Sequence, residues 1–136
     1  MDTTGTVIDT DILIDLLRNV KETVTFISEI EENETPLSTT VINAFELYYG
    51  AHKSKQQKQN LKATRKLLNR LILLPLEPTS AETAGHIYAE LETKGQPIGL
   101  RDSLIAAITL SNGFRIATKN VKHLQKITNL TVITAP

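Results

Sequence analysis

The sequence contains no cysteine, which excludes disulfides and every metal site built on thiolates. Any metal must therefore be bound by oxygen or imidazole. No apolar run approaches the roughly 20 residues that a membrane-spanning helix needs, and the chain has no internal repeat, low-complexity tract or linker. The N-terminal MDTTGT lacks the basic, apolar start of a secretory signal, so we expect a cytoplasmic protein that does not enter a membrane.

The formal net charge is zero, yet the charges are unevenly distributed along the chain. Ten of the fifteen acidic residues precede position 47, whereas seven of the fifteen basic residues lie between Lys53 and Arg70, where there is no acid. Such a chain can attract a polyanion to one face and concentrate carboxylates on another. The basic segment is equally typical of a solvated helix face, and both interpretations stay open.

Predicted strands and helices alternate along the chain, as judged from apolar periodicity and turn residues. Extended segments are predicted at 6–9, 34–39, 71–78, 114–120 and 130–135, and helices at 11–18, 21–33, 40–50, 54–71, 80–95, 98–113 and 121–127. The segment at 71–78 is predicted to be a buried strand, and Ser80 to cap the helix after it. This order favours a single domain over residues 1–136 with a three-layer α/β fold, a mainly parallel sheet of about four or five strands flanked by helices.

Three aspartates interrupt the apolar run TVIDTDILIDLL at residues 6–17. A buried carboxylate is costly unless it is paired, protonated or bound to a cation. Asp9 follows a predicted strand, at the end where parallel α/β sheets bind ligands. Asp11 starts the next helix, so complementarity to the helix dipole and a direct role at a metal are equally open, and Asp11 is also a candidate to support Asp9. Asp15, three residues before Arg18, is expected to be a surface or ion-paired charge.

Two further acids stand at the border between an apolar element and a turn. Glu46 lies in the mostly apolar VINAFELYYG, and Asp102 lies in the first turn of the helix that contains DSLIAA. Alone, each is an ordinary acid of a helix. Together with Asp9 they form a candidate site for a hard cation, because Mg²⁺ and Mn²⁺ prefer carboxylate and water ligands.

Four motifs occur in a recognisable order: VIDTDILIDLLR, TTVINAFELYYGA, GLRDSLIAAITLSNGFRIATKNVKHL and the terminal LTVI. With these motifs the chain resembles the PIN-domain ribonucleases, and most closely the VapC-type toxins of toxin–antitoxin pairs, over nearly its whole length. The resemblance implies a parallel sheet flanked by helices. It also implies endonucleolytic cleavage of RNA that depends on Mg²⁺ or Mn²⁺.

The resemblance also implies roles for individual residues. Asp9, Glu46 and Asp102 match the catalytic acids, with Asp9 and Asp102 as direct metal ligands and Glu46 acting through a ligated water. A fourth position, where many relatives have aspartate, falls on Asn120, which has no charge and implies weak occupancy of a second metal position. Thr118 resembles the hydroxyl that supports this corner of the site.

Basic residues supply the predicted contacts to RNA. Arg18 is the strongest single candidate for a phosphate contact or for pairing with an acid of a partner. If the basic segment binds RNA, then Lys53, Lys62 and Arg65 line the path of the backbone. The histidines have no metal-ligand spacing and are expected to be structural or surface residues: His52, His86 and His123.

The resemblance implies a homodimer that a small VapB-type antitoxin blocks. Two other functions stay open at this point. A PIN domain that cleaves weakly, and acts by binding RNA or a partner, is compatible with Asn120. The segment VIDTD also resembles the strand end of haloacid-dehalogenase-type phosphatases, but that family needs a second acidic pair, and Asp102 stands alone.

Overall fold

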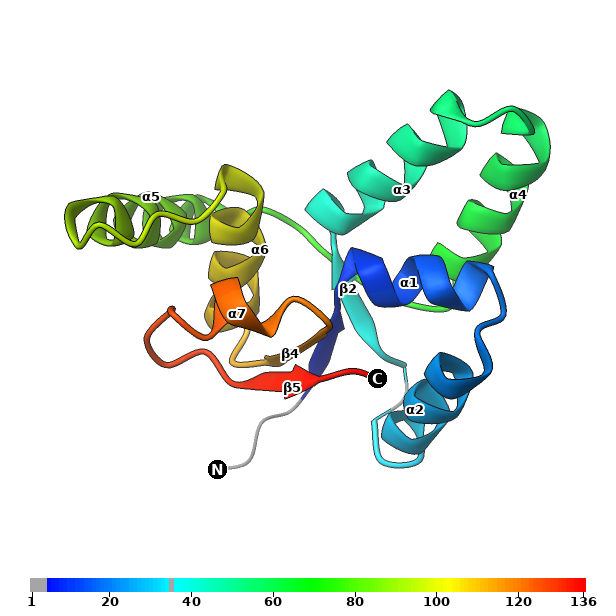
Figure 1. Cartoon of the computed structure of the whole chain (residues 1–136), viewed down its shortest axis with the longest axis horizontal. Coiled ribbons are helices and arrows are strands. Elements are labelled where there is room, and N and C mark those ends of the chain that lie inside the picture. The colour runs from blue at the N-terminus through cyan, green and yellow to red at the C-terminus, as the bar shows by residue number, and fades with distance from the viewer. Residues whose placement is uncertain (1–4, 35) are drawn as a thin grey trace.

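A five-stranded sheet lies at the centre of the computed structural model, which describes residues 5–34 and 36–136 (Figure 1). The strands are β1 (Thr6–Ile8), β2 (Ser38–Thr40), β3 (Ile72–Leu74), β4 (Arg115–Thr118) and β5 (Val132–Thr134). Their order across the sheet is β3-β2-β1-β4-β5, and all neighbours are parallel. The sheet therefore grows from β1 first to one side and then to the other, as in doubly wound folds. The predicted α/β fold with a parallel sheet is confirmed.

Helices connect the strands and cover both faces of the sheet (Figure 1). They are α1 (Thr10–Leu17), α2 (Lys21–Glu31), α3 (Val41–Lys53), α4 (Gln57–Leu68), α5 (Pro78–Thr93), α6 (Leu100–Ser111) and α7 (Val121–Leu124). The expectations placed on the N-terminal MDTT and on Thr35 fall outside the described residues. Within the described ranges, no helix is long and apolar enough to span a bilayer.

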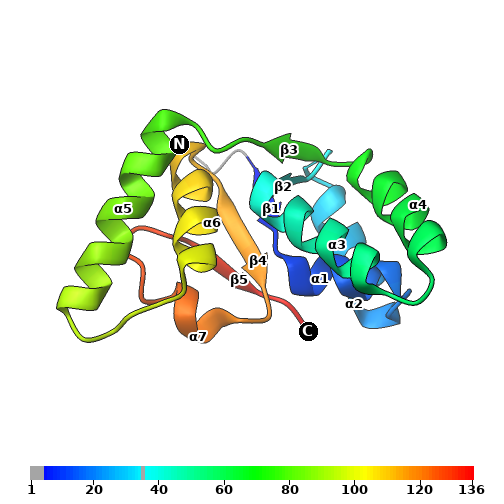
Figure 2. The ribbon, with the colours of Figure 1, turned by 90° about the horizontal axis from the view of Figure 1, so that it is seen from above.

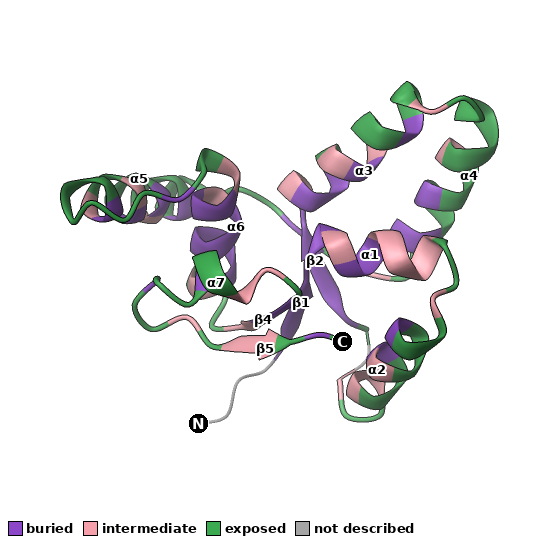
Figure 3. Cartoon of the chain, in the orientation of Figure 1, coloured by how far each residue is buried: buried purple, intermediate pink, exposed green. Residues whose placement is uncertain are grey.

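Successive side chains of a strand point to opposite faces of the sheet, so each central strand contributes to two cores. Val7 and Ile116 pack in a cluster with apolar residues of α5, α6 and α7. Ile8 and Ala117, the next residues along, pack in a second cluster with residues of α1, α2, α3 and α4. Figure 3 shows this burial concentrated in the central strands and on the inner faces of the helices. The two clusters define the three layers.

The strand at 71–78 differs from its prediction as a buried strand. Ile72 and Leu73 are 47% and 38% exposed, because β3 lies at an edge of the sheet with β2 as its neighbour. A short apolar run does not distinguish a central strand from an edge strand. Here the position in the sheet, which no local pattern encodes, decides the burial.

Several helix boundaries differ from the predictions: α4 spans Gln57–Leu68 instead of 54–71, and α7 ends at Leu124 instead of at residue 127. Two further differences have a clear physical reason. Helix α3 continues past Gly50 to Lys53, where basic residues in its last turn complement the helix dipole. Helix α5 is not capped by Ser80: it begins at Pro78, because proline suits the first helical position. Ser80 instead lies in the first turn of α5 and is fully buried.

Candidate active site

Asp9 lies where the two halves of the sheet diverge, directly after β1 and at the start of α1. Figure 2 shows this end of the sheet between α1 and α3 on one side and α6 and α7 on the other. The extended backbone of Asp9 lets its carboxylate cap α1 by accepting the Thr10 N–H at 2.8 Å. The residue is only 1% exposed, so its charge requires compensation inside the protein.

One guanidinium, that of Arg101, connects three carboxylates from distant parts of the chain. Its Nη2 donates to Asp9 at 2.7 Å, its Nε donates to Glu46 at 2.6 Å, and its Nη1 donates to Asp102. Asp9 follows β1, Glu46 lies on α3, and Asp102 lies in the first turn of α6. The structure therefore brings together the three acids that the sequence singled out.

A buried network holds Asp9 in one orientation. Asn43 donates to Asp9 at 3.0 Å and to the Thr10 hydroxyl at 2.9 Å, and Asn43 is itself fixed because it accepts from Thr40 in the capping box of α3. Thr118, at the end of β4, donates to the other oxygen of Asp9 at 2.7 Å. Thr118 therefore contacts Asp9 directly, and its supporting role at the site stays a prediction.

Arg101 and Asn43 were not singled out from the sequence. Arg101 directly precedes Asp102 in GLRDSL, and this adjacency to a candidate acid is the feature of the sequence that could have pointed to it. Burial lowers the pKa of Arg101, but the hydrogen bond to Glu46 and the charge and hydrogen bond of Asp9 together raise it above its ordinary value. Arg101 is therefore permanently charged, and it neutralises part of the acidic cluster.

Asp11 and Asp15 differ in their surroundings although both lie on α1. Asp11 accepts from the Lys119 backbone N–H at 3.1 Å with one oxygen, while its buried Oδ1 has no hydrogen-bond partner among the described residues. Burial and the neighbouring charge of Asp9 raise the pKa of Asp11. Asp15 is not a free surface charge: it pairs with Lys119 rather than with Arg18, and accepts from Thr23 at 3.1 Å.

Comparison with known proteins decides the family. The family model of the PIN domain matches residues 6–129. The chain belongs to the PIN-domain family. It is 31% identical to Ribonuclease VapC2 of Haemophilus influenzae over 120 residues, covering 88% of this chain and 89% of that protein. It is 29% identical to the tRNA(fMet)-specific endonuclease VapC of Shigella flexneri over 123 residues, covering 90% of this chain and 92% of that protein.

Solved structures agree with the assignment to the PIN-domain family, and within this family with the VapC ribonucleases. The Rickettsia felis VapBC2 structure, bound to a fragment of promoter DNA, matches with a TM-score of 0.89 at 26% identity over 96% of this chain and 98% of that one. VapBC-1 from nontypeable Haemophilus influenzae matches with a TM-score of 0.85 at 30% identity, over 95% of this chain and 96% of that one. The phosphatase alternative is therefore dropped.

Asn120 and the three histidines noted in the sequence differ in how close they lie to the acidic cluster. Asn120 begins α7, and its backbone N–H donates to the Thr118 hydroxyl at 2.9 Å. His123, expected to be a structural or surface residue, is half exposed and reaches within 3.6 Å of Asp102. His52 and His86 are exposed. Tyr49 is also exposed, and its ring stacks on Phe45 with centroids 6.3 Å apart.

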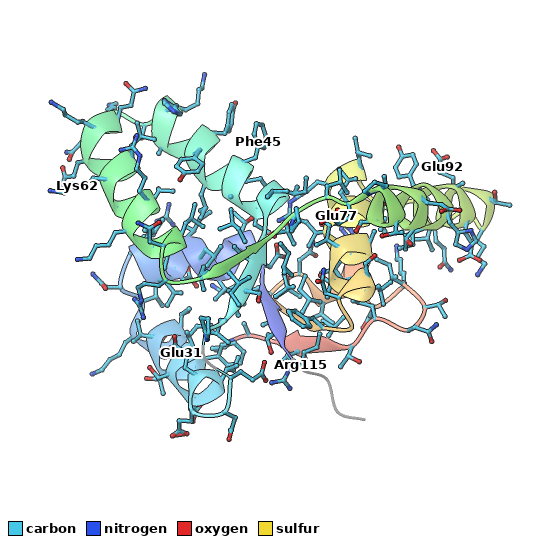
Figure 4. The ribbon with its side chains drawn as sticks, turned by 180° about the vertical axis from the view of Figure 1, so that it is seen from behind. Glu31, Phe45, Lys62, Glu77, Glu92 and Arg115 are labelled. Atoms are coloured by element: carbon cyan, nitrogen blue, oxygen red, sulfur yellow. The ribbon has the colours of Figure 1, made fainter. Side chains whose placement is uncertain are left out.

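The basic residues do not converge on the acids equally. Arg18 lines a groove of about 320 Å³ between α1, α3 and α4 that Glu46 also lines. Lys53 is exposed at the end of α3, and Lys62 and Arg65 are exposed on α4. Figure 4 shows Lys62 at the outer edge of the molecule, away from the sheet. Among these cations, Arg18 is the one that shares a groove with a cluster acid.

The donor set of the cluster suits a hard divalent cation. Asp9, Glu46 and Asp102 present carboxylate oxygens, and three negative charges meet the single positive charge of Arg101. Nevertheless, no three acids or histidines in residues 5–34 and 36–136 are placed to hold a metal together, and the Arg101 guanidinium lies among the three acids of the cluster. The ligand chemistry fits, and the position is shared with Arg101.

Proposed function

We propose that this PIN domain is the endoribonuclease toxin of a VapBC-type pair, and that its cleavage of RNA depends on Mg²⁺ or Mn²⁺. The observation that carries the proposal is the convergence of Asp9, Glu46 and Asp102 at the carboxyl ends of the parallel strands. An excess of carboxylates at this edge is suited to a cation that in turn binds a phosphodiester. The names of the VapC relatives, ribonuclease and tRNA(fMet)-specific endonuclease, support RNA as the substrate.

The chain divides the work of cleavage among its own residues. Asp9 and Asp102 would hold the cation, and Asn120 would provide a weak additional ligand. When bound, the cation lowers the pKa of a water and stabilises the charge that develops on the scissile phosphate. Glu46 is the most exposed of the three acids, at 28% of its side chain, and its carboxylate accepts the proton of the attacking water.

The surrounding residues position these groups and the substrate. Thr118 and Asn43 fix the Asp9 carboxylate, and Asp11 supports this corner through the Lys119 backbone. Arg18 contacts the RNA phosphates from the groove that it shares with Glu46. The proposed partners are the RNA substrate, a VapB-type antitoxin and a second copy of the chain, and the proposed location is the cytoplasm.

Asp9→Asn tests the catalytic assignment. The amide keeps an acceptor for the Thr10 N–H, so the fold is retained, as circular dichroism and thermal unfolding would verify. Cleavage of a mixed RNA pool should fall by more than the roughly 100-fold that loss of an outer-shell partner costs. Glu22→Gln, which removes an exposed acid on α2, is the matched control and should cleave at the wild-type rate. Wild-type cleavage by Asp9→Asn would refute the assignment.

Removal of metal ions distinguishes a metal-dependent nuclease from a PIN domain that only binds RNA. Chelation should abolish cleavage by the wild-type protein, and excess Mn²⁺ should restore it. Retention of RNA without cleavage under any metal would instead support the catalytically weak PIN domain. For the toxin assignment, expression should arrest growth, and co-expression of a short neighbouring reading frame that encodes the antitoxin should relieve the arrest.

A further inference from the structure

We propose that Arg101 is a built-in counter-ion of the acidic cluster that competes with the divalent cation for Asp9. In the metal-free protein the guanidinium holds the site, and metal entry displaces it. This inference rests on the proposed metal dependence, but it concerns the state of an arginine rather than the reaction.

The hydrogen bonds of Asp9 carry the first part of the argument. A carboxylate offers about four lone-pair sites. Asp9 accepts from Thr10, Asn43 and Arg101 with one oxygen, at 2.8, 3.0 and 2.7 Å, and from Thr118 with the other, at 2.7 Å. Three donors already share the two lone pairs of the oxygen that Arg101 links to Glu46 and Asp102, so a cation held jointly by these acids can bind that oxygen only when a donor leaves.

Arg101 is the donor that can leave. Asn43 and Thr118 are fully buried, and the Thr10 donor is a backbone N–H of α1. The Arg101 side chain is 34% exposed and projects from the first turn of α6, so it can swing into solvent without unfolding the helix. Replacing any of the other donors would require a rearrangement of the core.

Charge carries the second part. The guanidinium makes one hydrogen bond to each of Asp9, Glu46 and Asp102, so a single positive charge occupies the centre of three negative ones. A divalent cation at the same oxygens would face this charge at close range, where like charges repel strongly. The guanidinium and the divalent metal therefore exclude each other. In the metal-free protein, Arg101 offsets the mutual repulsion of the three carboxylates.

The direct test follows the side chain of Arg101 by NMR during a titration of the full-length wild-type protein with Mg²⁺. In the metal-free protein, the Arg101 Nε–H signal should be well dispersed and slow to exchange. At saturation it should move to the position of a solvent-exposed arginine. If Mg²⁺ binds and the signal does not move, the inference is wrong while the metal dependence stands. If no Mg²⁺ binds, both fail.

Calorimetric titration with Mn²⁺ provides a second measurement. In Arg101→Gln the affinity for Mn²⁺ should rise at least about tenfold, because the metal no longer has to displace the guanidinium from the carboxylates. Arg101→Lys keeps the charge but loses the three-way contact, so its affinity should also rise, whereas a pure charge effect would leave it unchanged. Arg115→Gln removes an arginine that pairs with Glu34 at the opposite end of the sheet, and it should not alter the affinity (Figure 4). Unchanged affinity in both Arg101 variants would refute the competition.

Discussion

At the residue scale, Asp11 and Asp15 lie on the same helix, yet their surroundings shift their pKa values in opposite directions. Burial, with the charge of Asp9, raises the pKa of Asp11, whereas the hydrogen bond from Lys119 lowers the pKa of Asp15. A raised folded-state pKa means that ionisation of Asp11 opposes folding at neutral pH. A lowered one means that the ionised Asp15 favours folding there, and that this contribution is lost on acidification.

Asp11→Asn should therefore stabilise the metal-free protein at pH 7. The gain should be about 1 kcal/mol, the lower end of the cost of an unpartnered buried polar atom. Because the wild-type penalty exists only when Asp11 is ionised, the difference should disappear as the pH falls below the ordinary pKa of 3.8. Urea unfolding in EDTA from pH 3 to pH 7 measures this. A difference that is constant with pH would show that ionisation of Asp11 is not its cause.

Asn43→Ala should destabilise the protein by about 3 kcal/mol, because it leaves several buried polar partners unsatisfied. Asn43 is 0% exposed and bonds to Asp9, Thr10 and Thr40. Asn112→Ala is the control, since the side chain of the exposed Asn112 makes one hydrogen bond to the described residues, at 2.7 Å to the Ile108 carbonyl. Its cost should stay below about 1 kcal/mol. Equal losses for the two variants in urea unfolding would argue against the network.

The convergence of three acids of the candidate site could be predicted from the sequence, but the residues that connect them could not. Asp9, Glu46 and Asp102 each interrupt an apolar element, and a charge in such a place needs a reason that a reader of the sequence can look for. Arg101 and Asn43 do not stand out in the sequence, because arginine and asparagine are common near the start of a surface helix. Their role depends on which elements lie opposite, and only the fold supplies that.

At the element scale, the helices were predicted better than the strands. Each helix has apolar residues at helical spacing and an end marked by glycine, proline or a polar run, and these signals are local. The strands are three or four residues long, too short for an alternating pattern to develop. Burial of such a strand depends on its neighbours, which is why β3 was assigned to the interior although it lies at the edge.

Two glycines provide a matched test of the helix boundaries. Gly85 lies within α5 and Gly113 follows α6 at a φ of +69°, and a Cβ added at either position would meet nothing within 4 Å. Gly85→Ala should stabilise the protein by about 0.5–1 kcal/mol through helix propensity. Gly113→Ala should destabilise it by about 1 kcal/mol, because alanine disfavours a positive φ. Thermal unfolding of both variants measures this, and a shift of the same sign in both would contradict the assigned backbone conformations.

At the scale of the whole molecule, the parallel sheet makes the site possible. Residues 9, 46, 102 and 118 are scattered over most of the chain, yet all lie at or beyond the carboxyl ends of strands, where a doubly wound sheet gathers them. The same topology separates the charges. The acidic N-terminal third supplies the edge that holds Asp9 and Glu46, while the basic segment forms the outer helix α4.

This separation predicts that two cations of similar exposure contribute differently to RNA binding. Arg18 shares a groove with Glu46, whereas Lys62 lies at the outer edge of α4. In an Asp9→Asn background that does not cleave, Arg18→Gln should weaken RNA binding and reduce the slope of log affinity against log salt by about 0.7, the value for one phosphate contact on a single strand. Lys62→Gln should change neither quantity, because its side chain lies at the outer edge of the molecule, away from the sheet (Figure 4). Filter binding at several salt concentrations measures both variants, and an equal loss of slope would place the RNA backbone along α4 instead of in the groove.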